Sequence, residues 1–477
     1  MKSKVIRCTV FLLAFIFLFQ SRSFADEQPV RGFWIWGATL TSSNIQTIVN
    51  KLADNYVNEV YLLVKGTSGT KTNATNLTSF ITKAHAKSIK VHFWYCVFQD
   101  DAYLRSNPNA HVYHCPNPSG RSGDVNPYPN TDSAINPFFP GYKEYVLNNI
   151  GYFLNNFDCD GIHLDYIRYG HLVYSFDPYS LEKAASLGCN TTRLLGFFNT
   201  PGNYTIYASG SGFINLYANR DPDVVTWVNM RKNIIFDYIT AIRDTMESVK
   251  PGIKLTAAFM PEGIYDPNLA DAHYAQNYAL HSTILDMISP MSYFKSYGKS
   301  TSWLKTIAIS AINRVDPRCK IVAGLQAFPG ADDVAVTATE MDEQIAYALE
   351  GGFYGVLIFK YDSSIDNASW VVIQSKFRSL SLTSTTDVYS ENHLLDQNLP
   401  NPFNSITEIT FQVTKPCLVS LNVYDALGRQ VAPLINKDMA PGTYKVSFNG
   451  NNLQSGVYFY RLDMAGLSSV RKMILTK

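Results

Sequence analysis

Short runs of apolar residues alternate with longer amphipathic segments between residues 32 and 361. In the segment after the first run, Ile45, Ile48 and Leu52 recur at helical spacing, and Ser42 or Ser43 is suited to cap the start of this helix. The eight apolar runs span residues 32–37, 59–66, 90–98, 159–168, 254–260, 287–294, 320–328 and 355–361. Because the runs are nearly continuous in apolar residues, they predict strands covered on both faces, as in parallel sheets.

Eight strand–helix units over about 350 residues predict a (β/α)8 TIM barrel with insertions, residues 30–378. The longest segments between the runs are a polar loop from Gln99 to Pro140 and an insertion over residues 170–222. A doubly wound sheet is the competing fold. The segment after the first run, WGATLTSSN, lacks the GxGxxG phosphate fingerprint of such sheets, so the barrel is preferred.

The pattern changes after residue 378. Residues 379–395 are polar and have no helical period, which is typical of a linker. Beyond them, short strand-like runs are separated by turn residues without a helical pattern. We therefore expect a small all-β, immunoglobulin-like sandwich over residues 396–477. The predicted fold class is α/β, a TIM barrel followed by this sandwich.

The N-terminus predicts export. MKSKVIR supplies positive charge, TVFLLAFIFLF is an apolar run too short for a comfortable membrane span, and Ser23 and Ala25 are small residues suited to cleavage. Residues 1–25 are therefore interpreted as a signal peptide. No later stretch is apolar enough to predict a transmembrane segment.

Composition limits the classes of binding partner that the sequence predicts. A formal net charge of +1 gives no reason to expect nucleic acid or an anionic membrane. The 30 Tyr and 28 Phe are well suited to stacking on sugars, although ordinary cores use the same rings. A chain of 477 residues is too long for one ordinary core and fits two domains.

Cysteine and histidine spacing predicts neither a metal site nor a cofactor. The chain has no CxxC pair, HExxH motif or acidic calcium loop, and His111, His114 and His163 are scattered. Export permits disulfides, and Cys115 and Cys189, in predicted loops, are the candidate pair. The remaining strand-associated thiols are expected to be free and buried: Cys96, Cys159 and Cys319.

The fourth run, CDGIHLDYIRYG, carries charges in an apolar strand. Alternation places His163, Asp165 and Ile167 on the face toward the barrel interior. Ile162, Leu164 and Tyr166 fall on the other face, toward the helices. Asp165 should then lie near the barrel mouth, where catalytic residues of this fold gather. A buried carboxylate is costly unless it is paired, so Asp165 is a functional candidate. The alternative is a structural Asp paired with Arg168 or His163.

Glycoside hydrolysis needs two carboxyl groups. The second candidate is Glu262 in FMPEG, just past the fifth run, where Phe259 and Met260 would raise its pKa toward that of a general acid. The alternative is an exposed loop Glu. Asp362, after the eighth run, is a third choice, and Asp286 is interpreted as structural because it opens the sixth run.

Other strand-end side chains are candidates to bind a sugar. Hydroxyl ligands are predicted for Lys65, Tyr293, Gln326 and Lys360. An aromatic platform is predicted from Trp34, Trp36, Trp94 and Tyr95, although barrels also bury such rings.

Three segments together resemble the glycoside hydrolase-like family 10, secreted bacterial (β/α)8 domains: DGIHLDYIRYG, YAQNYALHSTILDMISPMSYF and GGFYGVLIFKYDS. The resemblance covers residues 30–378. It implies hydrolysis of glycosidic bonds, in some members of bacterial cell-wall glycan, with Asp165 as catalytic carboxylate and His163, Arg168 and Tyr293 around it.

The chain departs from that family at Tyr278 and over 291–294, where a Trp-rich, Gln-containing version is common. The fourth run is also distantly similar to the DxxDxDxE strand of family 18 chitinases. Ile167 occupies the terminal Glu position, so a chitinase mechanism is not supported.

The tail from Leu399 to Lys477, including LPNPFNSITEITFQV and GVYFYRL, resembles the C-terminal sorting domain of type IX secretion cargo. This resemblance implies contact with the secretion machinery, passage across an outer membrane, removal of the tail with release or anchoring at the surface, and no part in catalysis.

The sequence therefore predicts a secreted or surface-held bacterial glycoside hydrolase that uses Asp165 and Glu262 on a polysaccharide or peptidoglycan glycan. The alternative is a carbohydrate-binding or cell-surface protein that uses the barrel as a scaffold.

Overall fold

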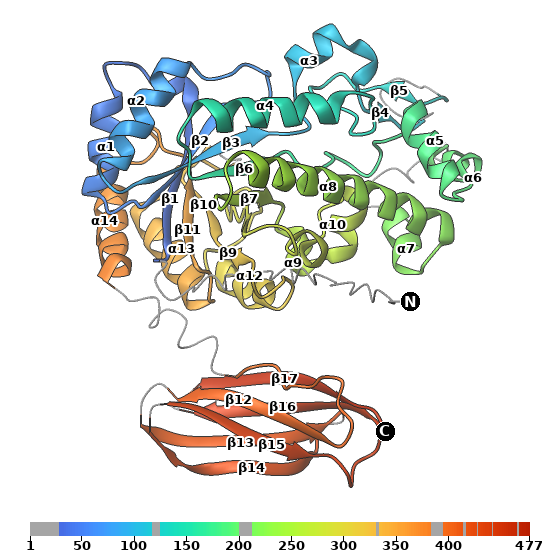
Figure 1. The fold of residues 1–477 in the computed structure, drawn as a ribbon, viewed down its shortest axis with the longest axis vertical. Coiled ribbons are helices and arrows are strands. Elements are labelled where there is room, and N and C mark those ends of the chain that lie inside the picture. Colours follow the sequence, from blue (N-terminus) through green and yellow to red (C-terminus); the bar gives the residue numbers. More distant parts are fainter. Residues whose placement is uncertain are drawn as a thin grey trace, which may run out of the picture.

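The structure, a computed structural model, consists of a barrel followed by a β-sandwich (Figure 1). The predicted signal peptide, residues 1–25, lies outside the described residues. These are 28–116, 125–199, 212–330, 333–382, 395–413, 416–426, 428–440, 442–464 and 467–477.

The barrel is a parallel sheet in the order β10-β11-β1-β2-β3-β6-β7-β8-β9. Each predicted run holds a strand, and the seventh run is divided at Val322 into β9, which pairs with β8, and β10, which pairs with β11. A parallel bridge between Met291 and Gly324 completes the closure, which confirms the barrel. The strands are β1 (Val30–Trp36), β2 (Glu59–Lys65), β3 (Lys90–Cys96), β6 (Gly161–Asp165), β7 (Lys254–Phe259), β8 (Met287–Pro290), β9 (Lys320–Ile321), β10 (Ala323–Gln326) and β11 (Gly355–Phe359).

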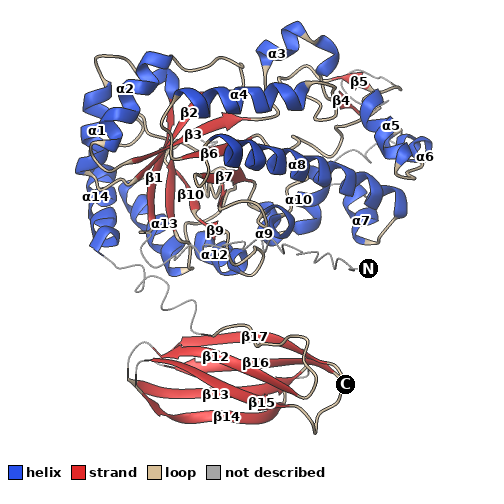
Figure 2. Cartoon of the chain, viewed as in Figure 1, coloured by secondary structure: helices blue, strands red, loops and turns tan. Residues whose placement is uncertain are grey.

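Helices cover the outside of this sheet (Figure 2). They include α1 (Ile45–Asp54), α2 (Ala74–His85), α4 (Tyr142–Asn156), α8 (Pro222–Val249), α12 (Trp303–Ile312), α13 (Ala338–Glu350) and α14 (Asn367–Leu382). The helical spacing predicted for α1 is confirmed, since Ile45, Ile48 and Leu52 are buried. Its N-cap is Asn44, not Ser42 or Ser43. The Asn44 side chain makes no capping bond to the helix, because its Oδ1 accepts from the Thr41 N–H instead.

The end of the barrel differs slightly from the predicted boundary. Helix α14 continues to Leu382, so the first part of the predicted linker, 379–395, is helical. Apolar contacts explain the extension, because Phe377 and Leu380 are buried in the barrel's outer core. Residues 383–394 of that linker lie outside the described residues.

The two long segments between strands contain more structure than their polar sequences predict. Residues 99–140 hold α3 (Asp101–Ser106), a 3₁₀ turn (Pro108–Ala110), β4 (Tyr113–His114) and β5 (Tyr128–Pro129). Residues 170–222 hold α5 (Pro178–Ser186), α6 (Thr191–Phe198) and α7 (Phe213–Ala218). The predicted Cys115–Cys189 disulfide is wrong: both thiols are free and buried in an apolar cluster around Phe176, Phe198 and Trp227.

Both sheets of the C-terminal domain are antiparallel, which confirms the predicted all-β sandwich. One sheet has the order β12-β15 and the other β14-β13-β16-β17. Alternate residues of β12 are buried, as expected for a strand with one face on a core. The strands are β12 (Ile406–Val413), β13 (Cys417–Asp425), β14 (Gln430–Met439), β15 (Gly442–Asn449), β16 (Gly456–Met464) and β17 (Leu467–Leu475). Within the described parts of the chain, no helix has the length and hydrophobicity needed to cross a bilayer.

Candidate active site at the barrel mouth

Strand β6 carries Asp165 to the C-terminal mouth of the barrel, as its alternation predicts. Ile162 and Leu164 pack in the outer apolar core, while His163 and Asp165 face the interior. The alternation stops at Asp165, where β6 ends. Tyr166 has φ of +49°, a left-handed turn that sends its ring to the cavity, and Ile167 is buried in the outer core. The predicted placement of these last two residues is therefore reversed.

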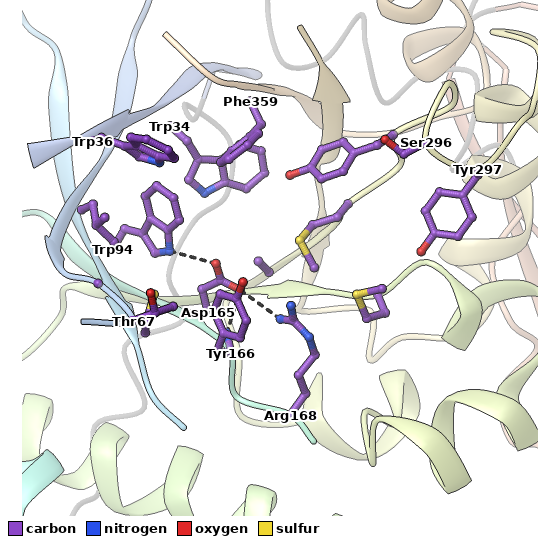
Figure 3. Close-up of a pocket in the computed structure, with 17 residues that line it drawn as sticks. Trp34, Trp36, Thr67, Trp94, Asp165, Tyr166, Arg168, Ser296, Tyr297 and Phe359 are labelled. Atoms are coloured by element: carbon purple, nitrogen blue, oxygen red, sulfur yellow. Dashed lines mark hydrogen bonds and ion pairs between the residues drawn. The ribbon is translucent and has the colours of Figure 1, made fainter. Parts of the chain in front are cut away.

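Asp165 is 6% exposed and is held by three donors (Figure 3). Its Oδ1 accepts from the Tyr166 N–H at 2.7 Å and from Arg168 Nη1 at 3.0 Å. Its Oδ2 accepts from Trp94 Nε1 at 3.1 Å. Both oxygens act as acceptors, as an ionised carboxylate requires. Oδ2 keeps acceptor capacity for a molecule in the cavity.

His163 lies one layer below and does not line the cavity. Trp34 Nε1 donates to His163 Nε2 at 3.1 Å, so the ring proton is on Nδ1, which donates to Thr256 Oγ1 at 2.8 Å. Burial, with a smaller effect of nearby His92, lowers the pKa of His163 well below its usual value. The neutral ring therefore positions Trp34 rather than touching a ligand.

A cavity of about 590 Å³ opens above Asp165. This volume lies within the ~300–1,000 Å³ usual for ligand pockets. Aromatic rings make up much of the wall: Trp34, Trp36, Trp94, Tyr166, Tyr293, Tyr297 and Phe359. Figure 3 labels all of these except Tyr293. Such rings combine a flat apolar face with polar edges, which suits the faces and hydroxyls of a sugar.

Glu262 lies behind this wall, at the start of the short helix α9 (Glu262–Tyr265). It is 7% exposed, which excludes the alternative of an exposed loop Glu. Tyr297, which lines the cavity, places its hydroxyl 3.1 Å from each carboxyl oxygen, and the Tyr274 hydroxyl donates to Oε1 at 3.4 Å. Burial raises the pKa of Glu262, and the two tyrosines oppose this shift only in part. Tyr297 thus links the Glu262 carboxyl group, whose pKa is raised by burial, to the cavity.

The predicted side chains divide between the cavity wall and its support. Those on the wall are Asp165, Arg168, Tyr293, Trp36 and Trp94, joined by Trp34 from the predicted platform. Predicted residues that do not line it are Glu262, His163, Lys65, Gln326 and Lys360.

The residues away from the wall have structural partners. Lys65 is fully buried, and its Nζ lies 2.9 Å from Asp100 Oδ2. Asp100 supplies the counter-ion that a buried ammonium group needs. Gln326 accepts from the backbone N–H groups of Lys295 and Ser296, and so holds the loop after β8. Lys360 lies 3.4 Å from the centroid of the Trp36 ring.

The other acidic and aromatic candidates also lie outside the wall. Asp362 pairs with Lys360 at 3.2 Å and accepts from the Ser364 N–H. Tyr95 is fully buried, with its ring against Phe153 in the outer core. Asp286 is held by Arg243 and the Leu255 N–H, in agreement with its structural interpretation.

Sequence reasoning missed Tyr166, Tyr297 and Phe359. Tyr297 follows Tyr293 by one helical turn's spacing in the loop after β8, and Phe359 ends β11. The signal that could have identified them is the presence of aromatic residues at or just after strand ends.

Among the described residues, no three His, Cys, Asp or Glu side chains gather as a metal site would require.

Residues 66–329, more than half of the 477-residue chain, match the glycosyl hydrolase-like 10 family. Residues 399–476 match the secretion system C-terminal sorting domain, which indicates a protein that is secreted or held at the cell surface. Both resemblances seen in the sequence are thereby confirmed. No curated protein matches the chain in sequence.

Solved structures with the same barrel fold include three carbohydrate-active proteins. The glycoside hydrolase domain of PgaB (BpsB) from Bordetella bronchiseptica has a TM-score of 0.56 at 12% identity, over 75% of this chain and 100% of that one. α-L-Fucosidase isoenzyme 2 from Paenibacillus thiaminolyticus has 0.50 at 16%, over 76% and 50%. A β-galactosidase from Bacillus circulans sp. alkalophilus has a TM-score of 0.51 at 11% identity, over 75% of this chain and 57% of that one. The chain thus spans about half the length of these two enzymes. At such identities the similarity concerns the fold.

Proposed function

The chain belongs to the glycosyl hydrolase-like 10 family, and from this premise we propose that its barrel hydrolyses O-glycosidic bonds in a polysaccharide or cell-wall glycan. One observation carries the proposal: a fixed carboxylate, Asp165, faces an aromatic-lined cavity at the barrel mouth. Catalytic groups of this fold gather at that end. The glycoside hydrolase, fucosidase and galactosidase with the same fold support the same class of reaction.

In this proposal Asp165 activates the attacking water. Three donors fix its position, and the free acceptor capacity of Oδ2 takes the water's proton as the new C–O bond forms. The negative charge also stabilises the oxocarbenium-like transition state. Arg168, 3.0 Å away, keeps the carboxylate oriented after each turnover.

Glu262 supplies the opposite proton through Tyr297. In the resting site the Tyr297 hydroxyl donates to Glu262. For the reaction this hydroxyl turns to the glycosidic oxygen, and the protonated Glu262 donates to the Tyr297 oxygen as the Tyr297 proton passes to the leaving sugar, so that the C–O bond breaks. One water is consumed, Asp165 ends protonated and Glu262 ionised, and proton exchange with solvent restores both. Burial raises the pKa of Tyr297, so its hydroxyl passes a proton only in concert with Glu262.

A second function, glycan binding without cleavage, is favoured by one observation. Asp165 is the only carboxylate among the described residues that line the cavity, whereas Glu262 is behind Tyr297. An aromatic cavity with one anion can hold a sugar without breaking it, if the relay does not operate.

The test is to incubate the full chain with a panel of purified polysaccharides and peptidoglycan, and to measure new reducing ends and retention of the protein on each. New reducing ends with at least one glycan are expected. Retention without new ends would support the binding function instead. Neither retention nor cleavage on any member would contradict both functions.

A further inference from the structure

A second cavity, of about 290 Å³, lies against the first. The two share Tyr166, Arg168 and Met260 in their walls. Most of the remaining wall of the second cavity comes from the segment after β3 and from residues after β6, and Tyr274 joins it from the segment after β7. Its side chains include Gln99, Ala134, Tyr174 and Tyr274. Tyr166 and Arg168 therefore form a junction with one cavity on either side.

The junction carries unused hydrogen-bond donors. Arg168 Nη1 donates to Asp165, and its guanidinium carbon lies 4.4 Å from the centroid of the Tyr166 ring. A guanidinium has five N–H donors, and those of Arg168 bond to no described acceptor besides Asp165. The Gln99 side-chain amide, in the second cavity, bonds to no other described residue. A ligand oxygen at the junction could accept from the Arg168 guanidinium, and a polar group farther along the ligand could bond to the Gln99 amide.

We propose that the second cavity binds the sugar unit next to the one above Asp165, so that the substrate is a glycan chain of two or more units lying across Tyr166 and Arg168. The inference rests on the proposed function of the first cavity. A volume of about 290 Å³, just below the ~300–1,000 Å³ usual for ligand pockets, accommodates a small group and not a long chain. Tyr166, Tyr174 and Tyr274 offer rings to the unit there, and Arg168 binds an oxygen between the units.

The segments that build the second cavity fix its selectivity. Ala134 and Gln99 belong to the 99–140 segment, and Tyr174 to the 170–222 insertion, neither of which is part of the barrel's repeating units. The backbone bridge between Gln99 and Ala134 holds the two residues together. Ala134 is 7% exposed, so a larger side chain there would project into a confined space.

The experiment compares Ala134→Phe, which fills the second cavity, with Ala86→Phe, the same change at an exposed position after α2. Gln99→Ala, which removes a polar group without adding volume, is the second variant. Probes are aryl monoglycosides and oligosaccharides of two to six units in the gluco, galacto, manno and N-acetylglucosamine series. Cleavage and quenching of tryptophan fluorescence, which reports the first cavity through Trp34, Trp36 and Trp94, are both measured.

We expect Ala134→Phe to weaken binding and cleavage of the oligosaccharides by about tenfold or more, and Gln99→Ala by a smaller factor, with aryl monoglycosides unaffected. Ala86→Phe should match the unmodified chain on every probe. Equal behaviour of Ala134→Phe, Gln99→Ala and the unmodified chain on the oligosaccharides would overturn the second cavity's role while leaving the proposed function intact. Oligosaccharides that neither bind nor are cleaved by the unmodified chain would overturn the proposed function, and this inference with it.

Discussion

The barrel and the sandwich bury different kinds of residue. Around its mouth the barrel buries charged side chains, among them Lys65, Asp100, Asp165 and Glu262. In the described part of the sandwich, the buried polar side chains are Asn398 and Thr407, and none is charged. Burying a charge costs free energy unless it is paired. The barrel thus gives up stability to fix charges beside a cavity, as chemistry requires, whereas a domain that serves sorting needs no buried charge.

Replacing Asp165 should give the largest difference in activity between a substitution in the barrel and a matched one in the sandwich. We expect Asp165→Asn to lower kcat/KM for a cleaved glycan by about 10²–10⁴-fold, because an amide cannot accept the water's proton. The reducing-end assay measures this loss. The matched control is Asp463→Asn in the sandwich, where Asp463 forms an exposed pair with Arg461. Full activity of Asp165→Asn would remove Asp165 from the mechanism.

Breaking the buried ion pair of the barrel should lower the free energy of unfolding more than any substitution in the sandwich considered below. Lys65 Nζ is 2.9 Å from Asp100 and also donates to the Cys96 and Gln99 carbonyls. Lys65→Met leaves the Asp100 charge buried and uncompensated, so we expect the barrel's free energy of unfolding to fall by about 3–5 kcal/mol. Denaturant unfolding followed by tryptophan fluorescence measures it. The double variant Lys65→Met/Asp100→Leu should regain part of the loss; no loss in the single variant would contradict the cost assigned to the buried charge.

Glu262 should control the alkaline side of the pH profile. Its pKa is raised above the ordinary 4.5 by burial, and its protonated form is the active acid. Activity should therefore fall as pH rises through this raised pKa. Glu262→Gln removes that alkaline limb and lowers kcat/KM by about 10²-fold, since the proton source is lost.

Tyr297→Phe is the control that distinguishes the relay from simple packing. Removal of the Tyr297 hydroxyl breaks the relay, so Tyr297→Phe should slow the reaction and abolish the alkaline limb, as Glu262→Gln does. A limb that only moves to higher pH would mean that Tyr297 acts solely by lowering the pKa of Glu262 through its hydrogen bond. An alkaline limb that stays in place in both Glu262→Gln and Tyr297→Phe would assign it to another group.

The sequence predicts the fold well because each barrel run is apolar and sandwich strands such as β12, β13 and β16 alternate between buried and more exposed residues. It also predicts that Asp165 faces the interior, since alternation along β6 holds as far as that residue. The left-handed turn at Tyr166 breaks the alternation, and no local pattern in DYIRYG announces it. Residues at similar strand ends then differ in role: Trp94 reaches Asp165, whereas Lys65 turns away to Asp100. The direction of the Lys65 side chain depends on Asp100, which lies in the 99–140 segment. The apolar pattern of the strands carries no information about such a partner.

A buried tyrosine in the sandwich should have a smaller effect than the barrel's buried charges. The Tyr460 hydroxyl donates to the Asp396 carbonyl at 2.7 Å and accepts from the Asn398 N–H at 2.7 Å. Tyr460→Phe leaves two backbone groups without this partner, so we expect a loss of about 1–3 kcal/mol. Thermal unfolding of the full chain measures it. Tyr458→Phe removes a single bond, to the Gln454 carbonyl, and should cost less; the opposite order would contradict this accounting.

The smallest change in the free energy of unfolding is expected when the exposed ion pair of the sandwich is broken. The substitution is again Lys to Met, so it can be compared directly with Lys65→Met. Lys445 Nζ lies 2.6 Å from Glu408, a shorter contact than that of Lys65 with Asp100, yet these side chains are 64% and 48% exposed. Water and salt screen both charges, so Lys445→Met should change the free energy of unfolding by only about 0–1 kcal/mol. Denaturant unfolding at low and high salt measures it, and any loss should shrink at high salt. A loss as large as that of Lys65→Met would mean that contact distance, not burial, sets the cost of breaking an ion pair in this protein.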